Sequence, residues 1–339
     1  MKRKDFLGWL GLGSAFFGTG YWFSRQNKNP NSEEICVTPV RSQSYSGLSP
    51  VGNPETSAFL HNSYGGMYHA PMTIRESYGD RFYFPPDWQS DETKNFKVSL
   101  YPMNLSIANN ITYPAWTYDG LAPGPIFRKK EGDILNFHFE NKSSDPHSLH
   151  FHGNHDPAFD GWTGVPPFGN IDYTIECDPV GILPYHCHVP PLAQHISKGL
   201  YGCLLVDPIR KRKKAHEYVL ILSGWDLEGK GKNDLYTWNG IAGFYDRYPI
   251  KVPVGETVRF YIVNMVEYDP IMTFHLHSKT FDIYRSGGEF VSDHSDVVSL
   301  GQTERVMIEF TLKKRGRYMF HPHQSYMAER GAMGWVVGI

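Results

Sequence analysis

Cysteine is scarce in this chain of 339 residues, and neither sign of charge is in excess. The sequence has four cysteines, whose wide spacing excludes the dense disulfide scaffold of a small secreted domain. It has 33 lysine and arginine residues against 35 aspartate and glutamate residues, so nothing indicates a nucleic-acid partner or a strongly charged ligand. A methionine-rich insertion is also absent. We expect three of the cysteines to be buried free thiols: Cys36, Cys177 and Cys203.

Turn-forming residues are abundant by contrast. The chain has 33 glycines, 24 prolines and an aromatic share of 15%, which is typical of an all-β protein with many turns. Its length predicts two domains, each large enough to bury a core of its own. Histidine is unusually frequent, with 16 residues, and many of these histidines gather in short motifs.

The first 25 residues have the composition of a targeting segment. A basic start (MKRK) precedes an apolar stretch that continues to Phe23. The sequence RKDFL at residues 3–7 resembles a twin-arginine export signal in which lysine replaces the second arginine. We expect residues 1–25 to be an export signal or a membrane anchor, and the protein to be exported to the periplasmic or extracellular face. Residues 26–95 are rich in serine, asparagine, glycine and proline, which predicts an irregular extension.

The remainder of the chain repeats one pattern twice. Residues 117–120 (TYDG) and 237–240 (TWNG) are turns, and each precedes an alternating strand that ends in asparagine, at Asn141 and Asn264. Self-similarity over so long a period indicates duplicated domains rather than a solenoid. We therefore predict domain 1 over residues 96–210 and domain 2 over residues 211–339.

Each predicted domain contains two His-x-His pairs. Side chains alternate between the faces of a strand, so the two imidazoles of such a pair point to the same side. Two imidazoles on one face can bind one metal ion or two neighbouring ions, and neutral imidazole is a good ligand for copper, zinc and iron. Four pairs at corresponding places in a duplicated domain predict metal sites rather than scattered surface histidines. The pairs are His150/His152, His186/His188, His275/His277 and His321/His323.

Cysteine separates the two histidines of the second pair, in His186-Cys187-His188. The same alternation sends the Cys187 thiolate to the opposite face from its neighbours. The sulfur can then bind one metal while the flanking imidazoles bind others. One short covalent path would join the two metal centres, which predicts electron transfer between them.

A blue-copper site needs two histidines and one cysteine in a trigonal plane, with a weak axial ligand. His147 lies three residues before the first pair and hence on the opposite strand face, and His195 follows Cys187 by eight residues. We predict that His147, Cys187 and His195 form this site, with His155 as the competing candidate for the His147 position. Leu200 occupies the place where an axial methionine would sit. A leucine there predicts a three-coordinate copper with a raised reduction potential.

These motifs resemble those of the multicopper oxidase and copper nitrite reductase superfamily. Residues 147–153 (HSLHFHG) and 185–202 are similar to its copper-binding motifs, and the likeness extends over residues 95–339. The resemblance is strongest to the two-domain, laccase-like group, in which three chains form a ring. It implies two tandem cupredoxin-like Greek-key β-barrels, a homotrimer, and trinuclear copper clusters that lie between domain 1 of one subunit and domain 2 of the next.

The resemblance also implies a ligand set for four coppers per chain. His150 and His275 resemble the ligands of one type 2 copper, whereas the single type 1 copper is the blue site of domain 1. Domain 2 departs from the pattern of a blue site, because Met272, Pro322 and Arg330 replace the two histidines and the cysteine. Six further histidines resemble the ligands of two type 3 coppers: His152, His186, His188, His277, His321 and His323.

Asp160 lies shortly after the first pair, in the sequence FDGW at residues 159–162. Multicopper oxidases tend to place at this position an acid that passes protons towards the oxygen being reduced. The reduction of dioxygen consumes protons as well as electrons, so a nearby carboxylate is chemically reasonable. An Asp-Gly turn with no catalytic role is the alternative.

We therefore expect a copper-dependent oxidoreductase that takes single electrons from a reducing substrate, through the edge of His195 or His147, and reduces O₂ to water. A copper nitrite reductase has the same two barrels but needs only one type 2 copper, so positions 150 and 188 would not both have to be histidine. A protein that only stores copper or transfers electrons would leave the extra pairs unexplained, and the Cys187–His195 arrangement disfavours a hydrolytic zinc protein. The sequence does not identify the electron donor among phenols, aromatic amines, metal ions and partner proteins.

Overall fold

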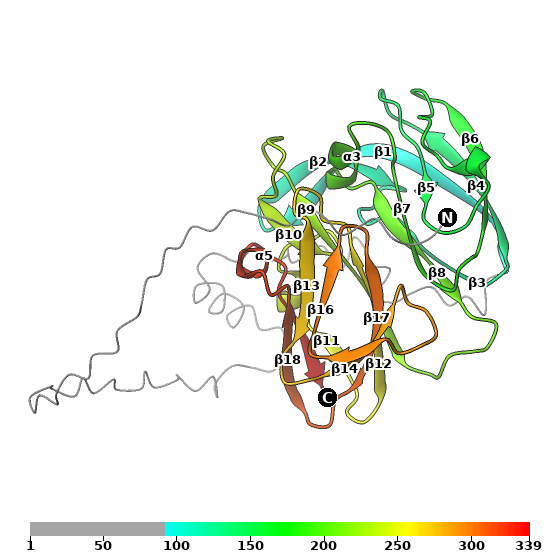
Figure 1. The fold of residues 1–339 in the computed structure, drawn as a ribbon. Helices are drawn as coiled ribbons and strands as arrows, with labels where there is room; N and C mark the ends of the chain where they lie inside the picture. Colours follow the sequence, from blue (N-terminus) through cyan, green and yellow to red (C-terminus); the bar gives the residue numbers. More distant parts are fainter. Residues whose placement is uncertain (1–91) are drawn as a thin grey trace, which may run out of the picture. The chain divides into compact units, whose positions relative to one another are not determined.

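The computed structural model describes residues 92–339. The predicted targeting segment, nearly all of the predicted extension, and Cys36 lie outside these residues. Within them, no helix is both long enough and apolar enough to cross a membrane. Most of the regular structure is strand, in two groups that follow each other along the chain, from cyan and green in the first to yellow and red in the second (Figure 1).

The first group of strands forms two four-stranded sheets around one core. Their strand orders are β2-β1-β4-β6 and β3-β8-β7-β5, with the bounds β1 (Asn95–Ala108), β2 (Ile111–Tyr118), β3 (Ile126–Lys130), β4 (Ile134–Asn141), β5 (His150–Phe151), β6 (Asn170–Glu176), β7 (Gly181–His186) and β8 (Tyr201–Asp207). Alternation along β4 buries Leu135, Phe137 and Phe139. These side chains share a core with Phe151 and Tyr185 of the other sheet.

The second group forms a six-stranded and a five-stranded sheet. Their orders are β10-β9-β12-β17-β14-β15 and β11-β19-β18-β13-β16, with the bounds β9 (His216–Trp225), β10 (Leu235–Trp238), β11 (Ile250–Val252), β12 (Thr257–Asn264), β13 (Ile271–Leu276), β14 (Phe281–Arg285), β15 (Asp293–Ser295), β16 (Val297–Gly301), β17 (Arg305–Thr311), β18 (Gly316–His321) and β19 (Gly334–Gly338). Trp238, Phe260, Phe274 and Phe320 pack together in the core.

Both groups repeat the same pairing pattern. In the first, β1 runs parallel to β4 and β3 runs parallel to β8. In the second, the corresponding pairs β9 with β12 and β11 with β19 are also parallel. The short helices η2 (Pro157–Phe159), α3 (Leu192–Ser197), α4 (Phe244–Arg247) and α5 (Ser325–Glu329) lie in the connections. The prediction of an all-β chain with two tandem cupredoxin-like barrels is confirmed.

The asparagines that end the two alternating strands organise the loops beyond them. The Nδ2 group of Asn141 donates to the carbonyls of Asp145 and Val165. Asn264 donates in the same way to the carbonyls of Leu300 and Gly301. Asn141 thus satisfies backbone groups of the loop before the first histidine pair, and Asn264 satisfies those at the end of β16.

A buried ion network joins the strands of the first group to those of the second. Arg128 pairs with Asp207 at 2.6 Å and with Glu217 at 2.7 Å, and Arg259 pairs with the same Glu217 at 2.7 Å. Burial raises the pKa of Glu217, but the hydrogen bonds and charges of its partners outweigh that effect and lower the pKa to about 2. The network fixes β3 and β8 against β9 and β12.

Candidate metal centres

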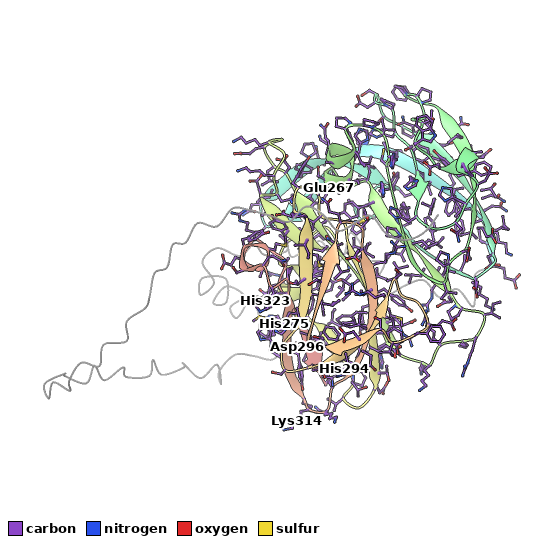
Figure 2. All side chains as sticks on the ribbon, viewed as in Figure 1. Glu267, His275, His294, Asp296, Lys314 and His323 are labelled. Carbon is purple, nitrogen blue, oxygen red and sulfur yellow. The ribbon has the colours of Figure 1, made fainter. Side chains whose placement is uncertain are left out.

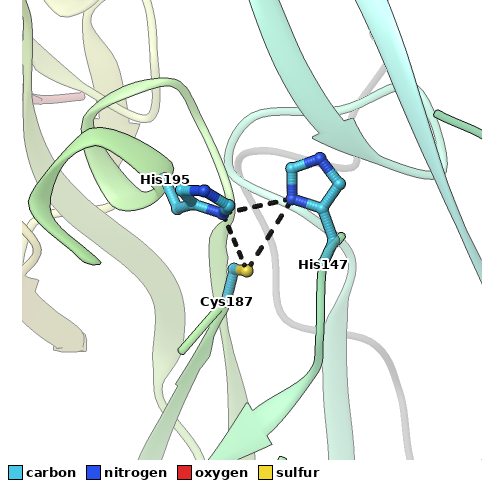
Figure 3. A group of neighbouring side chains, drawn as sticks. All are labelled: His147, Cys187 and His195. Atoms are coloured by element: carbon cyan, nitrogen blue, oxygen red, sulfur yellow. Dashed lines mark hydrogen bonds between the residues drawn. The ribbon is translucent and has the colours of Figure 1, made fainter. Parts of the chain in front are cut away.

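One thiol and two imidazoles converge in the first barrel (Figure 3). The Sγ atom of Cys187 lies 3.1 Å from Nδ1 of His195 and 3.8 Å from Nδ1 of His147, and the two Nδ1 atoms are 3.1 Å apart. Three different segments supply them. His147 forms an isolated β-bridge with Val165, Cys187 directly follows β7, and His195 belongs to α3.

The geometry of these three atoms fits a metal ion such as copper. A point equidistant from them lies about 2 Å from each, close to the length of metal–imidazole and metal–thiolate bonds. Burial lowers the pKa of His147 to about 3, with a contribution from His195, and lowers the pKa of His195 to about 4. Both rings are therefore neutral and offer lone pairs. Burial raises the pKa of the Cys187 thiol, so a bound metal has to displace its proton.

Leu200 is fully buried and belongs to the same core cluster as Cys187. Its backbone carbonyl accepts the Cys187 N–H at 3.2 Å, which ties the two segments together. The N–H of Ser148 lies 3.4 Å from the sulfur and can stabilise a thiolate. The groups brought together at this place are one thiol and two imidazoles.

The histidines on either side of Cys187 face a second group of imidazoles. Nε2 of His186 lies 3.0 Å from Nε2 of His152. The ring of His188 lies 5.0 Å from the ring of His150, measured between centroids. Strand register explains this convergence, because His150 of β5 pairs directly with His186 of β7. The structure shows the sorting to opposite faces that strand alternation predicts.

Hydrogen bonds at Nδ1 orient two of these rings for metal binding. His150 Nδ1 lies 2.5 Å from the carbonyl oxygen of Asp160, and His186 Nδ1 lies 2.9 Å from the carbonyl oxygen of Cys187. Carbonyls only accept, so the protons sit on Nδ1 and Nε2 is left as the ligand atom. Burial lowers the pKa of His152 to about 3 and that of His186 to about 4, which keeps both rings neutral.

The second barrel repeats this arrangement. His275 of β13 pairs with His321 of β18, and Nε2 of His277 lies 2.9 Å from Nε2 of His321. Nδ1 of His275 donates to the carbonyl of Asp296 at 2.8 Å, just as His150 donates to Asp160. The ring of His323 lies 5.4 Å from that of His275. Figure 2 labels His275, Asp296 and His323 in this part of the second barrel.

The two sets of histidines are separate within one chain. Every group of converging ligand atoms found in residues 92–339 draws its members from a single barrel. His150, His152 and His186 form one such group, and His275, His277 and His321 form another. Each barrel therefore offers half of the predicted eight-histidine ligand set.

The position of Asp160 is compatible with both interpretations of the sequence, an acid near the first histidine pair and an Asp-Gly turn. Its carboxylate oxygen lies 3.4 Å from Nε2 of His155 and 3.6 Å from Nδ1 of His150. The following residue, Gly161, has a φ of +75°, and a Cβ there would approach the carbonyl oxygen of Leu149 to 2.3 Å. The Asp-Gly turn is therefore a steric requirement, and the carboxylate still lies beside the histidine set. His155 belongs to this acidic corner and not to the thiol site.

Sequence reasoning missed two neighbours of the predicted ligands. Asp296 occupies the same position beside His275 that Asp160 occupies beside His150, but no Asp-Gly motif marks it. Trp116 packs edge-on against both imidazoles of the thiol site. In the sequence, Trp116 is marked only as the aromatic residue directly before the TYDG turn.

The substitutions that remove a blue site from the second barrel are explained by packing. Met272 is fully buried in the core with Phe274, and Pro322 is buried as well. The guanidinium of Arg330 donates to the carbonyl of Asn233. Met327 and Met333 are also buried, as expected for packing residues. Cys177 and Cys203 are buried free thiols, which confirms that prediction for the described cysteines.

Comparison with known protein families gives matches over both barrels. Two family models, each described as multicopper oxidase, match residues 101–211 and 226–338. A crystal structure of a multicopper oxidase is 36% identical in sequence and superposes with a TM-score of 0.70, covering 72% of this chain and 88% of that one. A copper nitrite reductase from Nitrosomonas europaea is 26% identical, with a TM-score of 0.67 over 72% of this chain and 93% of the other.

Curated relatives include both kinds of copper enzyme. The copper-containing nitrite reductase of Neisseria meningitidis serogroup B is 28% identical over 280 residues, which span 74% of this chain and 70% of the relative. Laccase-8 of Oryza sativa subsp. japonica is 26% identical over 267 residues, which span 67% of this chain and 46% of the laccase. These similarities extend over both barrels and include a nitrite reductase as well as a laccase.

Proposed function

This chain belongs to the multicopper oxidase family, and from that membership we propose that it is a laccase-like oxidase that couples one-electron oxidation of a reducing substrate to reduction of O₂ to water. The family and the donor set make it a copper oxidoreductase. The proposal of O₂ as acceptor rests on one observation, the preservation of four converging histidines in each barrel. A single type 2 copper would not require all eight.

Copper, when bound, supplies the one-electron redox chemistry that no side chain provides. His147, Cys187 and His195 would hold the type 1 ion, and the eight paired histidines would hold the type 2 ion and the two type 3 ions. The peptide bond between Cys187 and His186 connects the two kinds of site through a few covalent bonds. The position of Asp160 beside His150 supports a role for its carboxylate in holding a proton for the oxygen being reduced.

We also propose a homotrimer in which each complete cluster combines the histidines of two copies. The separation of the two histidine sets within residues 92–339 supports this, because each set is only half of the proposed cluster. Exposed apolar side chains also lie near both sets. Ile271 and Val297 belong to strands that pair at His275, and Trp162 follows Asp160 by two residues. Contact between copies would cover these side chains. Export to the periplasmic or extracellular face remains part of the proposal.

The second candidate is a copper nitrite reductase, and the curated relatives favour it. Nitrite reductases of Neisseria are similar to this chain over most of its length. The experiment that separates the two functions is metal quantification of the copper-loaded protein with parallel assays of oxygen uptake and nitrite reduction. We expect four coppers per chain, a blue absorption that fades on reduction, and oxygen uptake. Two coppers per chain with nitrite turnover and no oxygen uptake would replace the oxidase proposal.

A further inference from the structure

Within residues 92–339, Trp116 of β2 is the aromatic side chain that packs against both imidazoles of the thiol site. The centroid of its ring lies 4.6 Å from that of His147 and 4.8 Å from that of His195, at interplanar angles of 72° and 61°. The two imidazoles are themselves 4.8 Å apart, so the three rings form one compact cluster. His147 and His195 are 0% and 4% exposed, whereas Trp116 is only partly buried. Trp116 is thus the member of the cluster that reaches the surface.

The indole is held in place by the segment that follows His195. The backbone N–H of Trp116 donates to the carbonyl of Lys198 at 2.9 Å. The ammonium group of the same Lys198 lies 4.9 Å from the centroid of the Trp116 ring, within the range of a cation–π contact. Lys198 is the C-cap of α3, the helix that carries His195. The position of the indole and that of the imidazole are therefore set by one segment.

We propose that Trp116 is the residue through which electrons pass from the donor to the site of His147, Cys187 and His195. This inference rests on the proposed function. Because both imidazoles are almost completely buried, an external donor meets the indole before it meets either of them. In each step an aromatic donor would lose one electron and release its O–H proton to solvent, and a copper(II) ion held by His147, Cys187 and His195 would accept the electron. The indole is unchanged overall.

The competing interpretation is that Trp116 only packs against the imidazoles and excludes water. Trp116→Phe separates the two, because it keeps an aromatic ring against both imidazoles but removes the readily oxidised indole. Trp116→Tyr restores a redox-active ring and serves as the rescue variant. Trp335→Phe is the matched control. Trp335 of β19 is also partly buried and lies under a cation, the guanidinium of Arg317 at 4.3 Å, but in the second barrel.

The test is anaerobic stopped-flow reduction of the copper-loaded proteins by hydroquinone, followed by loss of the blue absorption. The spectrum and the reduction potential of each protein are measured alongside. We expect Trp116→Phe to keep the wild-type spectrum and potential but to be reduced several-fold more slowly, with Trp116→Tyr in between and Trp335→Phe unchanged.

Reduction of Trp116→Phe at the wild-type rate would overturn the proposal. A slower rate accounted for entirely by a shifted potential would overturn it too, because Trp116 would then act only by positioning the ligands. A wild-type protein without blue absorption after copper loading would overturn the proposed function itself. This result can be distinguished from failure of the Trp116 proposal, because electron transfer through Trp116 can be tested only in a protein that shows the blue absorption.

Discussion

Cys187 and His186 are adjacent in sequence but face opposite sites. The sulfur of Cys187 lies 3.1 Å from Nδ1 of His195, whereas Nε2 of His186 lies 3.0 Å from Nε2 of His152. One peptide bond therefore connects a thiol site with a histidine site. The proposed oxidase needs this link, because electrons accepted at the thiol site have to reach the site where oxygen is reduced.

Replacing the thiol should separate the two sites. We expect Cys187→Ser to abolish the blue absorption and the oxidase activity, because serine does not replace a thiolate as a copper ligand. The coppers of the histidine cluster should remain. Absorption spectroscopy with copper analysis measures both effects. Cys203→Ala, which removes a buried thiol outside either site, is the control and should stay blue. Retained turnover in Cys187→Ser would count against the electron path.

The second barrel should be needed for the reduction of oxygen but not for the blue absorption. We expect His321→Ala to keep the blue absorption and to lose oxygen uptake, because it removes the partner of His277 without touching the first barrel. Oxygen uptake is followed with an oxygen electrode. His138→Ala changes an exposed histidine and should behave as wild type. Normal oxygen uptake by His321→Ala would show that the second barrel takes no part.

Sharing of the cluster between copies can be tested by mixing two inactive chains. His152→Ala disables the first-barrel set, and His321→Ala disables the second-barrel set. When the two variants are co-expressed, an intact first barrel of one copy can face an intact second barrel of the other. We expect oxygen uptake to return in the mixed assemblies, whereas each variant alone stays inactive. Absence of any recovery in assemblies that contain both chains would mean that the cluster forms within one chain.

Leu200, which we predict to occupy the axial position, should set the reduction potential of the blue site. Leu200→Met supplies a thioether at the predicted axial position, so we expect the potential to fall. Exchange of leucine for methionine in a core conserves volume and costs less than about 1.5 kcal/mol. Leu204→Met in the same core cluster is the control for packing and should leave the potential unchanged. A spectroscopic redox titration gives both values, and equal potentials in wild type and Leu200→Met would contradict the axial role.

The buried ion network predicts a loss of stability in acid. The pKa of Glu217 is lowered from 4.5 to about 2 in the folded protein. A lowered carboxyl pKa stabilises the fold at pH values above the unfolded-state pKa, and this stability is lost as the pH falls towards 2. The difference corresponds to about 3 kcal/mol at neutral pH.

Substitution of this carboxyl should therefore have a pH-dependent cost. We expect Glu217→Gln to lower the free energy of unfolding at pH 7 by about 3 kcal/mol, because it leaves two buried arginines short of a partner. The deficit should shrink between pH 5 and pH 2. Urea unfolding of the copper-free protein across this range measures it. Glu256→Gln, at an exposed carboxyl beside His216, should change stability little. A deficit that does not vary with pH would contradict the assignment.

The strand period made the ligand sites predictable, and irregular segments limited the prediction. His150, His186, His275 and His321 lie in strands, so their faces follow from their positions in the sequence. The position of His155 cannot be derived in this way, because the loop after β5 lacks the regular alternation of a strand. The path of that loop depends on Gly161 and on Asn141.

Contacts between distant segments were beyond sequence reasoning for the same physical reason. Trp116 packs against His147 and His195, and its backbone N–H donates to the carbonyl of Lys198, so its position depends on segments far apart in the sequence. Asp296 reaches His275 through pairing of the strands around it. Neither contact leaves a local pattern. By contrast, the departure of Met272 and Pro322 from the ligand pattern can be recognised from the sequence alone, because ligand chemistry depends on residue type.

The most direct test is to mix fully reduced, copper-loaded protein with oxygen or with nitrite and to follow the blue absorption. In the proposed oxidase, electrons leave the site of Cys187 only through the neighbouring histidines. We expect that oxygen restores the blue colour, that each O₂ consumes four electrons without release of peroxide, and that nitrite has no effect. A colour that stays bleached in oxygen but returns with nitrite would contradict the oxidase assignment.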